Sequence, residues 1–162
     1  MAPAFAALTF QGSAQERERA DIPDEYKWNL ARIYPSIEAW RGARQEIAAG
    51  LPDLKPFTGR LGSSAITLAD ALDRLYGLQK ELSRAYAYAS MLADQDTRDT
   101  THEAMRQEMV QLAAAFGAAA SYIEPEILGL APGTVERFIS TEPRLAPYRF
   151  YLEDVVRRAP HT

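Results

Sequence analysis

Apolar residues recur at helical spacing along two long stretches in the middle of the chain. Within residues 67–93, apolar side chains occupy two positions of each seven-residue repeat over about four heptads. The same spacing continues through residues 105–123 for about three heptads. This pattern predicts two long helices, each with one apolar face. The first face consists of Leu68, Ala71, Leu75, Leu78, Leu82, Ala85, Ala89 and Leu92, and the second of Met105, Met109, Leu112, Phe116, Ala119 and Ile123.

A polar stretch, residues 94–100, separates the two apolar patterns. A short polar break between two long apolar faces predicts an antiparallel helical hairpin, with arms of roughly 40 Å each. The stretch is rich in aspartate, but it does not match a calcium loop. Asp99 and Met105 stand where an EF-hand needs glycine and glutamate. We therefore interpret its aspartates as caps of the following helix.

Shorter helices are expected on both sides of the hairpin. Ser36 is suited to N-cap a helix that buries Trp40 and Ile47. Residues 26–35, which lead into it, carry aromatic and aliphatic anchors and predict an extended strap on the surface. The anchors are Tyr26, Trp28, Leu30, Ile33 and Tyr34.

The C-terminal third is divided by prolines. Pro125 should kink or restart the second hairpin arm, because its ring displaces one helical hydrogen bond. Thr134 should N-cap a short helix, and a last helix should follow Pro143. The expected buried residues of that last helix are Leu145, Tyr148, Tyr151, Leu152 and Val155. With hardly a β-branched run flanked by glycine, the predicted fold is all-α: a long antiparallel helical hairpin with additional helices, bundle-like.

Composition narrows the kind of partner. The 162 residues are 47% hydrophobic and 25% charged, which is typical of a globular domain or part of a larger one. The net charge is −4, with no basic cluster longer than Arg157-Arg158, so nucleic acid is not expected as a partner. The apolar first ten residues are too short to span a membrane, and residues 1–25 predict a flexible lead-in. The absence of cysteine fits a reducing cytoplasm.

The sequence contains no recognisable catalytic or metal-binding motif. His102-Glu103 begins like H-E-x-x-H, but Arg106 takes the place of the second histidine. Glu124 and Glu126 stand two residues apart, and positions two apart do not face each other on a helix. We predict no catalytic residue, no metal ligand and no cofactor site in this chain. A small helical enzyme using Asp or Glu residues is the least favoured interpretation.

Tyr86 and Tyr88 also stand two residues apart, on different faces of the predicted helix. If Tyr86 lay toward the apolar face, Tyr88 would turn away and meet another domain or a ligand. The simpler interpretation is that both pack within the fold, since aromatic residues at helical spacing usually belong to the core.

Several short motifs, taken in order, resemble oligoendopeptidase F-type peptidases. Tyr26-Lys27-Trp28-Asn29-Leu30 with Ile33-Tyr34 is similar to the family's Trp-Asp-Leu…Ile/Leu-Tyr opening, with Asn29 in place of Asp. The resemblance continues in Tyr86-Ala87-Tyr88-Ala89-Ser90 followed by Asp94-Gln95-Asp96-Thr97, in Glu124-Pro125-Glu126-Ile127-Leu128, in Leu145-Ala146-Pro147-Tyr148 through Tyr151-Leu152, and in Arg158-Ala159-Pro160-His161-Thr162.

The resemblance implies a cytosolic zinc metallopeptidase that cleaves short peptides inside an enclosed, mostly helical channel. In that family H-E-x-x-H and a further glutamate bind zinc, and none of these residues is present here. We therefore expect residues 26–162 to be the helical N-terminal domain of a larger peptidase, with the catalytic domain absent and the chain inactive alone. Its partners would be that domain and short peptides. The face toward the channel or the other domain is expected at Tyr86, Tyr88, Asp94, Asp96 and Thr97.

One alternative stays open on the sequence alone. The two apolar faces could equally bind a partner helix or self-associate, which would make the chain a stand-alone helical interaction module.

Overall fold

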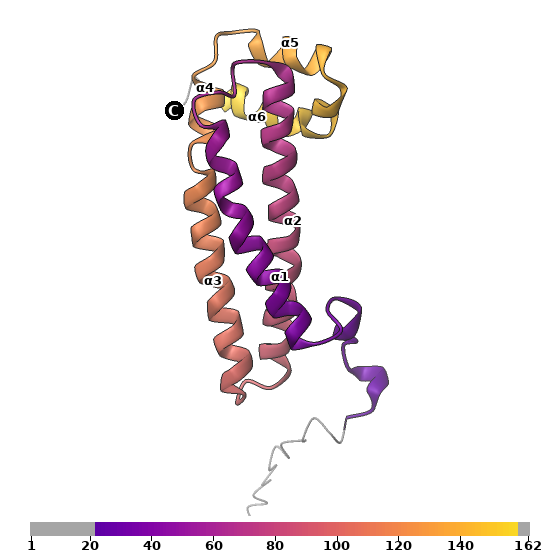
Figure 1. Cartoon of the computed structure of the whole chain (residues 1–162). Coiled ribbons are helices and arrows are strands. Elements are labelled where there is room, and N and C mark those ends of the chain that lie inside the picture. Colours follow the sequence, from indigo (N-terminus) through magenta and orange to yellow (C-terminus); the bar gives the residue numbers. More distant parts are fainter. Residues whose placement is uncertain (1–21, 159–162) are drawn as a thin grey trace, which may run out of the picture.

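The computed structural model describes residues 22–158, and within this range all regular structure is helical (Figure 1). The predicted all-α class is therefore confirmed. Most of the predicted lead-in, residues 1–25, lies outside the described range. The α-helices are α1 (Ile37–Gly50), α2 (Ala65–Gln95), α3 (Thr100–Ala120), α4 (Ile123–Leu128), α5 (Thr134–Thr141) and α6 (Arg149–Arg158), and the 3₁₀ turns are η2 (Asp24–Tyr26), η3 (Leu30–Arg32), η4 (Leu51–Phe57) and η5 (Pro143–Tyr148).

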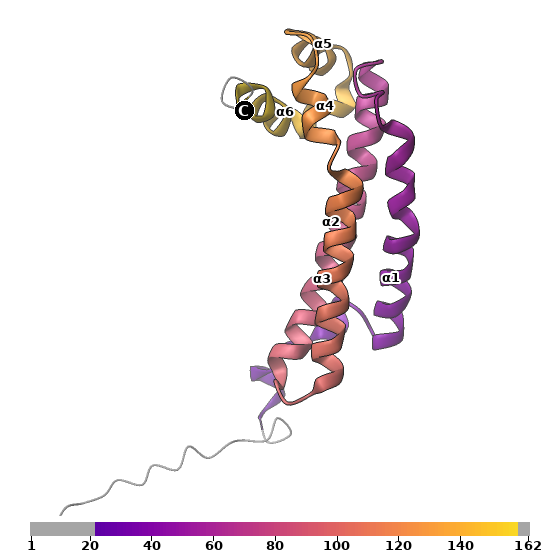
Figure 2. The ribbon, with the colours of Figure 1, turned by 90° about the vertical axis from the view of Figure 1, so that its left-hand side faces the viewer.

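The antiparallel hairpin of α2 and α3 forms the long axis of the molecule, and α1 packs along one side of it (Figures 1 and 2). With 31 and 21 residues, the arms span roughly 46 and 32 Å at 1.5 Å per residue. The second arm is thus shorter than the predicted 40 Å. It ends at Ala120, and the helix restarts as α4 with Pro125 in its first turn, which confirms the predicted restart.

Helix α2 contributes to two separate apolar cores. Its first half packs with the short helices at one end of the molecule, where the buried residues include Leu54, Leu61, Leu68, Leu72, Ile127, Leu145, Leu152 and Val155. Its second half packs with α1, the start of α3 and the strap, around Leu30, Tyr34, Trp40, Ile47, Leu82, Ala85, Tyr88, Met105 and Met109.

Two of the three expected helix starts have the predicted cap. The Ser36 hydroxyl accepts the Ala39 N–H at 3.2 Å and begins α1, and Asp99 caps α3. Thr134 does not cap α5, so that prediction is wrong. Gly133 occupies the position instead with φ 79°, a left-handed conformation that glycine adopts without steric cost.

The strap before α1 is only partly packed, and it is not extended. Leu30 and Tyr34 are buried, and the Tyr34 N–H donates to the Leu30 carbonyl at 3.1 Å, so one turn directs both side chains inward. Tyr26 and Trp28 precede this turn and remain 75% and 53% exposed. Their predicted role as anchors is wrong for the part of the chain that the structure describes, because at least half of each side chain stays uncovered there.

Arg84 of α2 fastens the strap to the hairpin. Its Nη2 donates to the Ile33 carbonyl at 2.6 Å, and its guanidinium lies 4.6 Å from the centre of the Tyr34 ring. Tyr34 in turn meets the Tyr88 ring edge-on, with 5.4 Å between centroids.

A polar clamp fixes η5 to α2 at the opposite end. Arg144 Nη2 lies 2.8 Å from an Asp70 carboxylate oxygen and 2.5 Å from one of Asp73. The Tyr148 hydroxyl donates to Asp73 at 2.6 Å, and its ring stacks on Tyr76. Burial and this bond to Asp73 raise the pKa of Tyr148 to about 12.

Trp28 of the strap and Trp40 of α1 provide a matched test of stability. Trp40 is buried and its indole N–H donates to the Ala85 carbonyl at 3.0 Å, whereas Trp28 is half exposed. We expect Trp40→Ala to lower the free energy of unfolding by about 3–5 kcal/mol, the usual cost of removing a buried tryptophan. Trp28→Ala should cost less than about 1 kcal/mol. Urea denaturation followed by circular dichroism measures both, and equal losses would contradict the packing described.

Candidate functional site

The two tyrosines singled out from the sequence lie on opposite sides of α2. Tyr88 is 5% exposed and packs against Tyr34, while Tyr86 is 37% exposed. The alternative from the sequence is that Tyr86 lies toward the apolar face and Tyr88 turns away. The structure shows the opposite: Tyr88 lies toward the core and Tyr86 turns away. Tyr88 is therefore covered by the strap of its own chain, and only Tyr86 offers its ring to solvent or a ligand.

The remaining candidates form the turn at the tip of the hairpin. Asp94 and Thr97 are exposed, and Asp96 is partly exposed. The Asp96 carboxylate accepts the backbone N–H of Arg98 at 3.0 Å and its side-chain Nε and Nη2 at 2.9 Å each. These bonds lower the pKa of Asp96 to about 2. The turn is thus a surface feature closed by the bonds between Asp96 and Arg98, and whether it faces another domain stays a prediction.

The part of the chain that the structure describes contains no group of three or more histidine, aspartate or glutamate residues suited to a metal ion. His102 Nδ1 lies 3.3 Å from Asp99, which already caps α3 through the backbone N–H groups of Thr101 and His102. This arrangement orders a helix start. It does not fit the three protein ligands that a catalytic zinc ion requires.

Glu124 and Glu126 have separate structural partners, in agreement with their predicted placement on different faces. Glu124 pairs with Arg158 of α6 at 2.9 Å. The Glu126 carboxylate accepts the backbone N–H of Gly59 at 2.8 Å and that of Leu61 at 2.6 Å. Glu126 therefore anchors the loop between η4 and α2 to α4, and the two carboxylates do not share a reaction centre.

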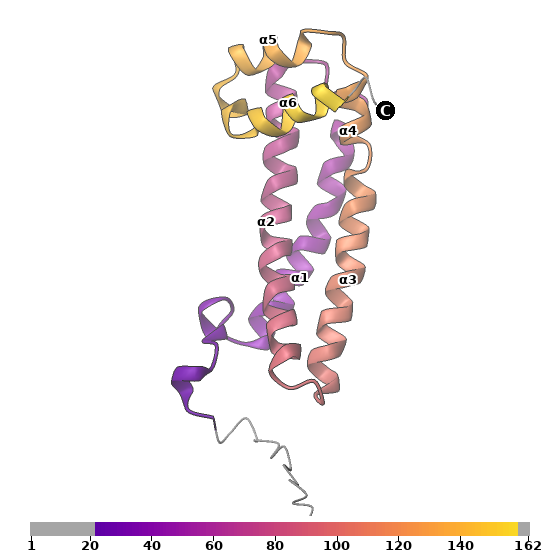
Figure 3. The same cartoon turned by 180° about the vertical axis from the view of Figure 1, so that it is seen from behind.

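A groove lies on the face of the hairpin away from α1. Figure 3 looks onto this face, with α1 behind the hairpin and α6 crossing in front of one end. The groove has a volume of about 360 Å³, and α2, α3, α4 and α6 all contribute to it. Gly117 and Ala120 provide small residues along α3, and beyond the backbone of its own helix Gly117 has open space where a side chain would stand.

Three polar side chains of this groove are neutral and have no described protein partner, whereas Ser121 donates to the Ala118 carbonyl and the Glu124 carboxylate pairs with Arg158. The hydroxyls of Tyr76 and Tyr151 and the amide of Gln79 make no hydrogen bond to another described residue, although the two rings contact each other edge-on. Burial is the main reason that the pKa of Tyr151 rises to about 12, so both hydroxyls stay protonated at neutral pH. Tyr86 lies seven residues beyond Gln79, on the same side of α2. Such groups can hydrogen-bond a peptide backbone without selecting its sequence.

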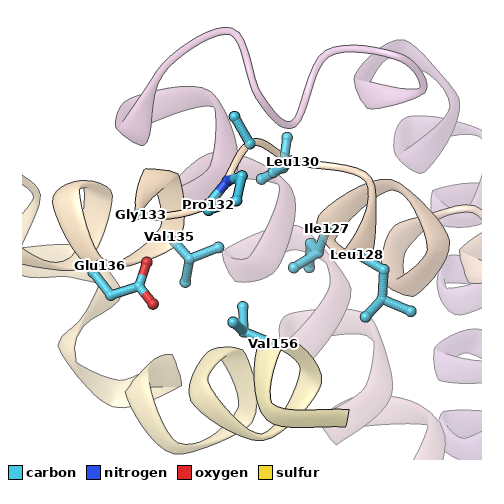
Figure 4. Close-up of a pocket in the computed structure, with 9 residues that line it drawn as sticks. Ile127, Leu128, Leu130, Pro132, Gly133, Val135, Glu136 and Val156 are labelled. Atoms are coloured by element: carbon cyan, nitrogen blue, oxygen red, sulfur yellow. The ribbon is translucent and has the colours of Figure 1, made fainter. Parts of the chain in front are cut away.

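A second hollow lies at the α4–α6 end and is mainly apolar. Figure 4 shows Ile127, Leu130, Val135 and Val156 around it, with the Glu136 side chain at one side. Its volume is about 190 Å³. Sequence reasoning missed both hollows, because each is built from segments that are far apart in the chain.

Comparison with known proteins identifies the class. The family model described as Oligopeptidase F matches residues 126–162. Oligopeptidase PepF of Bacillus subtilis (strain 168) is 31% identical over 144 residues, which cover 89% of this chain and 22% of that protein. A crystal structure of oligoendopeptidase-F from Enterococcus faecium matches with a TM-score of 0.71 and 26% identity, over 78% of this chain and 25% of that one. The crystal structure of a candidate peptidase from Chlamydophila abortus matches with a TM-score of 0.79 and 25% identity, over 90% of this chain and 25% of that one.

Sequence and fold therefore both relate the chain to peptidases. Over most of its length the chain is similar to members of the oligopeptidase F family, and these matches support an N-terminal fragment of that family. It spans about a quarter of the length of the relatives it matches, or slightly less.

The acidic turn gives a prediction for pH. Because the folded pKa of Asp96 is about 2 against an ordinary value of 3.8, its contribution to stability is complete above about pH 5 and is lost as the pH falls toward 2. Carboxyl ¹³C titration by NMR should give a midpoint near 2, and Arg98→Met should raise it toward 3.8. Asp99, whose donors are backbone groups, should keep its lowered pKa in that variant. An Asp96 midpoint near 3.8 in the unsubstituted chain would show that the Arg98 bonds do not persist in solution.

Proposed function

We propose that the chain is the helical N-terminal domain of an oligoendopeptidase F-like zinc metallopeptidase that hydrolyses short peptides. It forms part of the wall of the substrate channel and carries none of the catalytic groups. The observation that carries this proposal is the combination of a peptidase match over 89% of the chain with the lack of any metal-binding cluster among residues 22–158.

The chemistry of a zinc peptidase then resides in the rest of the protein. The zinc ion would activate water, and its ligands would come from the domain that this chain lacks. That domain and short peptides are the expected partners, in the cytoplasm, which a sequence without cysteine suits. The task left to this domain is to hold and confine the peptide.

The hairpin face away from α1 is the surface we assign to the channel. It combines a groove of about 360 Å³ with small residues on α3 and unpaired neutral hydrogen-bonding groups on α2 and α6. A wall of this kind suits an unfolded peptide of mixed sequence, because its contacts are with the peptide backbone. Tyr86 would extend the same face toward the tip residues Asp94, Asp96 and Thr97, while Tyr88, on the opposite side of α2, packs against the strap.

The isolated chain provides the first test. Purified chain with added zinc should not cleave an internally quenched fluorescent peptide of about eight residues, because it supplies no three-ligand site for the metal. Cleavage that co-purifies with the chain and is abolished by a zinc chelator would contradict a purely supporting role.

Two exposed helical glycines allow a sharper test of the channel wall. Gly117 lines the groove and Gly42 lies on α1, and beyond the backbone of its own helix each has open space where a side chain would stand. In the peptidase that contains this chain, Gly117→Tyr should obstruct the peptide and raise KM by about tenfold. This is the effect expected when a contact with bound substrate is lost without a change in the chemical step.

Gly42→Tyr is the matched control, since it adds the same ring to the opposite side of the domain. It should leave KM unchanged. Equal kinetics for the two variants would remove the groove from the substrate path while leaving family membership intact.

A further inference from the structure

Phe150 is the most exposed of the large apolar side chains that the structure describes. It stands in the first turn of α6 and is 83% exposed, above Tyr26 at 75% and Ile66 at 58%. Arg149 precedes it, with its guanidinium largely exposed and bonded only loosely, at 3.4 Å, to Glu153. An uncovered phenyl ring beside a cation is the chemistry of an interface anchor, where aromatic and arginine side chains contribute most.

The apolar hollow at the same end of the molecule has the complementary chemistry. Its volume of about 190 Å³ exceeds the roughly 150 Å³ of an apolar protein cavity known to hold benzene, so a phenyl ring fits. Aliphatic side chains surround it (Figure 4). Glu136 lies at its side and makes no ion pair with another residue in the described range. A phenyl ring seated here would bring its attached cation toward an available carboxylate.

Phe150 cannot fill the hollow of its own chain. Val156 of α6 lines the hollow, and six residues of α-helix separate it from Phe150, which places the two side chains roughly 120° apart around the helix axis. Leu152 and Val155, on the inward side, are fully buried, so α6 cannot rotate to exchange these positions. An aromatic occupant of this hollow therefore has to come from outside α6 of the same chain.

We propose that two copies of this chain associate by seating Phe150 of each copy in the hollow between α4, α5 and α6 of the other, with Arg149 pairing with Glu136. Ring and hollow both involve α6, so a two-fold axis beside this helix can bring each ring to the other copy's hollow and close the assembly as a dimer. This association does not depend on the proposed peptidase role. It names the surface through which the chain meets a second copy.

Sedimentation equilibrium of the purified full chain over a wide concentration range tests the contact. The unsubstituted chain should pass from monomer to dimer as its concentration rises. Phe150→Ser should weaken dimerisation by about 30-fold or more, the loss typical of an interface hot spot. Val110→Ser is the matched control, because it removes an exposed apolar side chain from the middle of α3 and should leave the dissociation constant unchanged.

Charge reversal tests the partner of the ring. Glu136→Lys and Arg149→Glu should each weaken the dimer by about tenfold, and the double variant should recover most of the loss. Circular dichroism shows whether each variant remains folded. Methyl NMR adds a readout at the hollow itself, since the signals of Val135 and Val156 should shift with protein concentration in the unsubstituted chain and not in Phe150→Ser.

Three results would overturn the proposal. The chain remains a monomer at every concentration, as it would if this end were covered only by another part of a longer protein. It dimerises equally well with Phe150→Ser. In the third, the double variant Glu136→Lys with Arg149→Glu dimerises as weakly as the two single losses add up to, and the methyl signals of Val135 and Val156 do not shift with concentration.

Discussion

The apolar seam along α2 is the feature on which the rest of the structure depends. One face of this 31-residue helix enters both apolar cores, so the strap, α1 and α3 meet at one half and the short helices at the other. Helices α4, α5 and α6 have 6, 8 and 10 residues, well below the length at which an isolated helix is stable in water. They are ordered because the first half of α2 buries their apolar residues, with Arg144 and Tyr148 adding a polar clamp to Asp73.

Most of the fold could be predicted from the sequence because it follows local rules. The seven-residue spacing of Leu68, Leu75 and Leu82 fixes the inward face of α2 whatever packs against it, and Ser36 and Asp99 cap helices through bonds within three residues. The prediction that Thr134 caps α5 is wrong because the chain enters this helix through a left-handed residue. Gly133 adopts that conformation without steric cost and so takes the cap position.

The functional surfaces could be predicted only in part, because they depend on distant contacts. That Tyr86 and Tyr88 lie on different faces follows from their spacing, but which one is covered depends on Tyr34, more than fifty positions earlier in the sequence. Glu126 gave no signal as a loop anchor, since its donors at Gly59 and Leu61 are 67 and 65 residues away. The groove and the hollow likewise exist only once α6 folds back over α2 and α4.

The two surfaces divide the proposed roles between them. The groove on the hairpin carries small residues and unpaired neutral groups, which suit a peptide backbone, and its one carboxylate, Glu124, is already paired with Arg158. The hollow at the α4–α6 end carries the unpaired Glu136 carboxylate beside aliphatic walls, which suits one ring and one cation. His102 and the aspartates at the tip, which superficially suggest metal chemistry, serve to begin α3 and to close the turn. Under the proposed function, the domain binds and confines the peptide, and the rest of the protein supplies the chemistry.

The mass of the native product in its source cell, detected with an antibody raised against this chain, tests the central claim most directly. The account predicts a species several times larger than 18.0 kDa, with zinc-dependent peptide cleavage in the same fractions. A stable species of 18.0 kDa, separate from any such activity, would contradict the account and leave a self-associating helical module in its place.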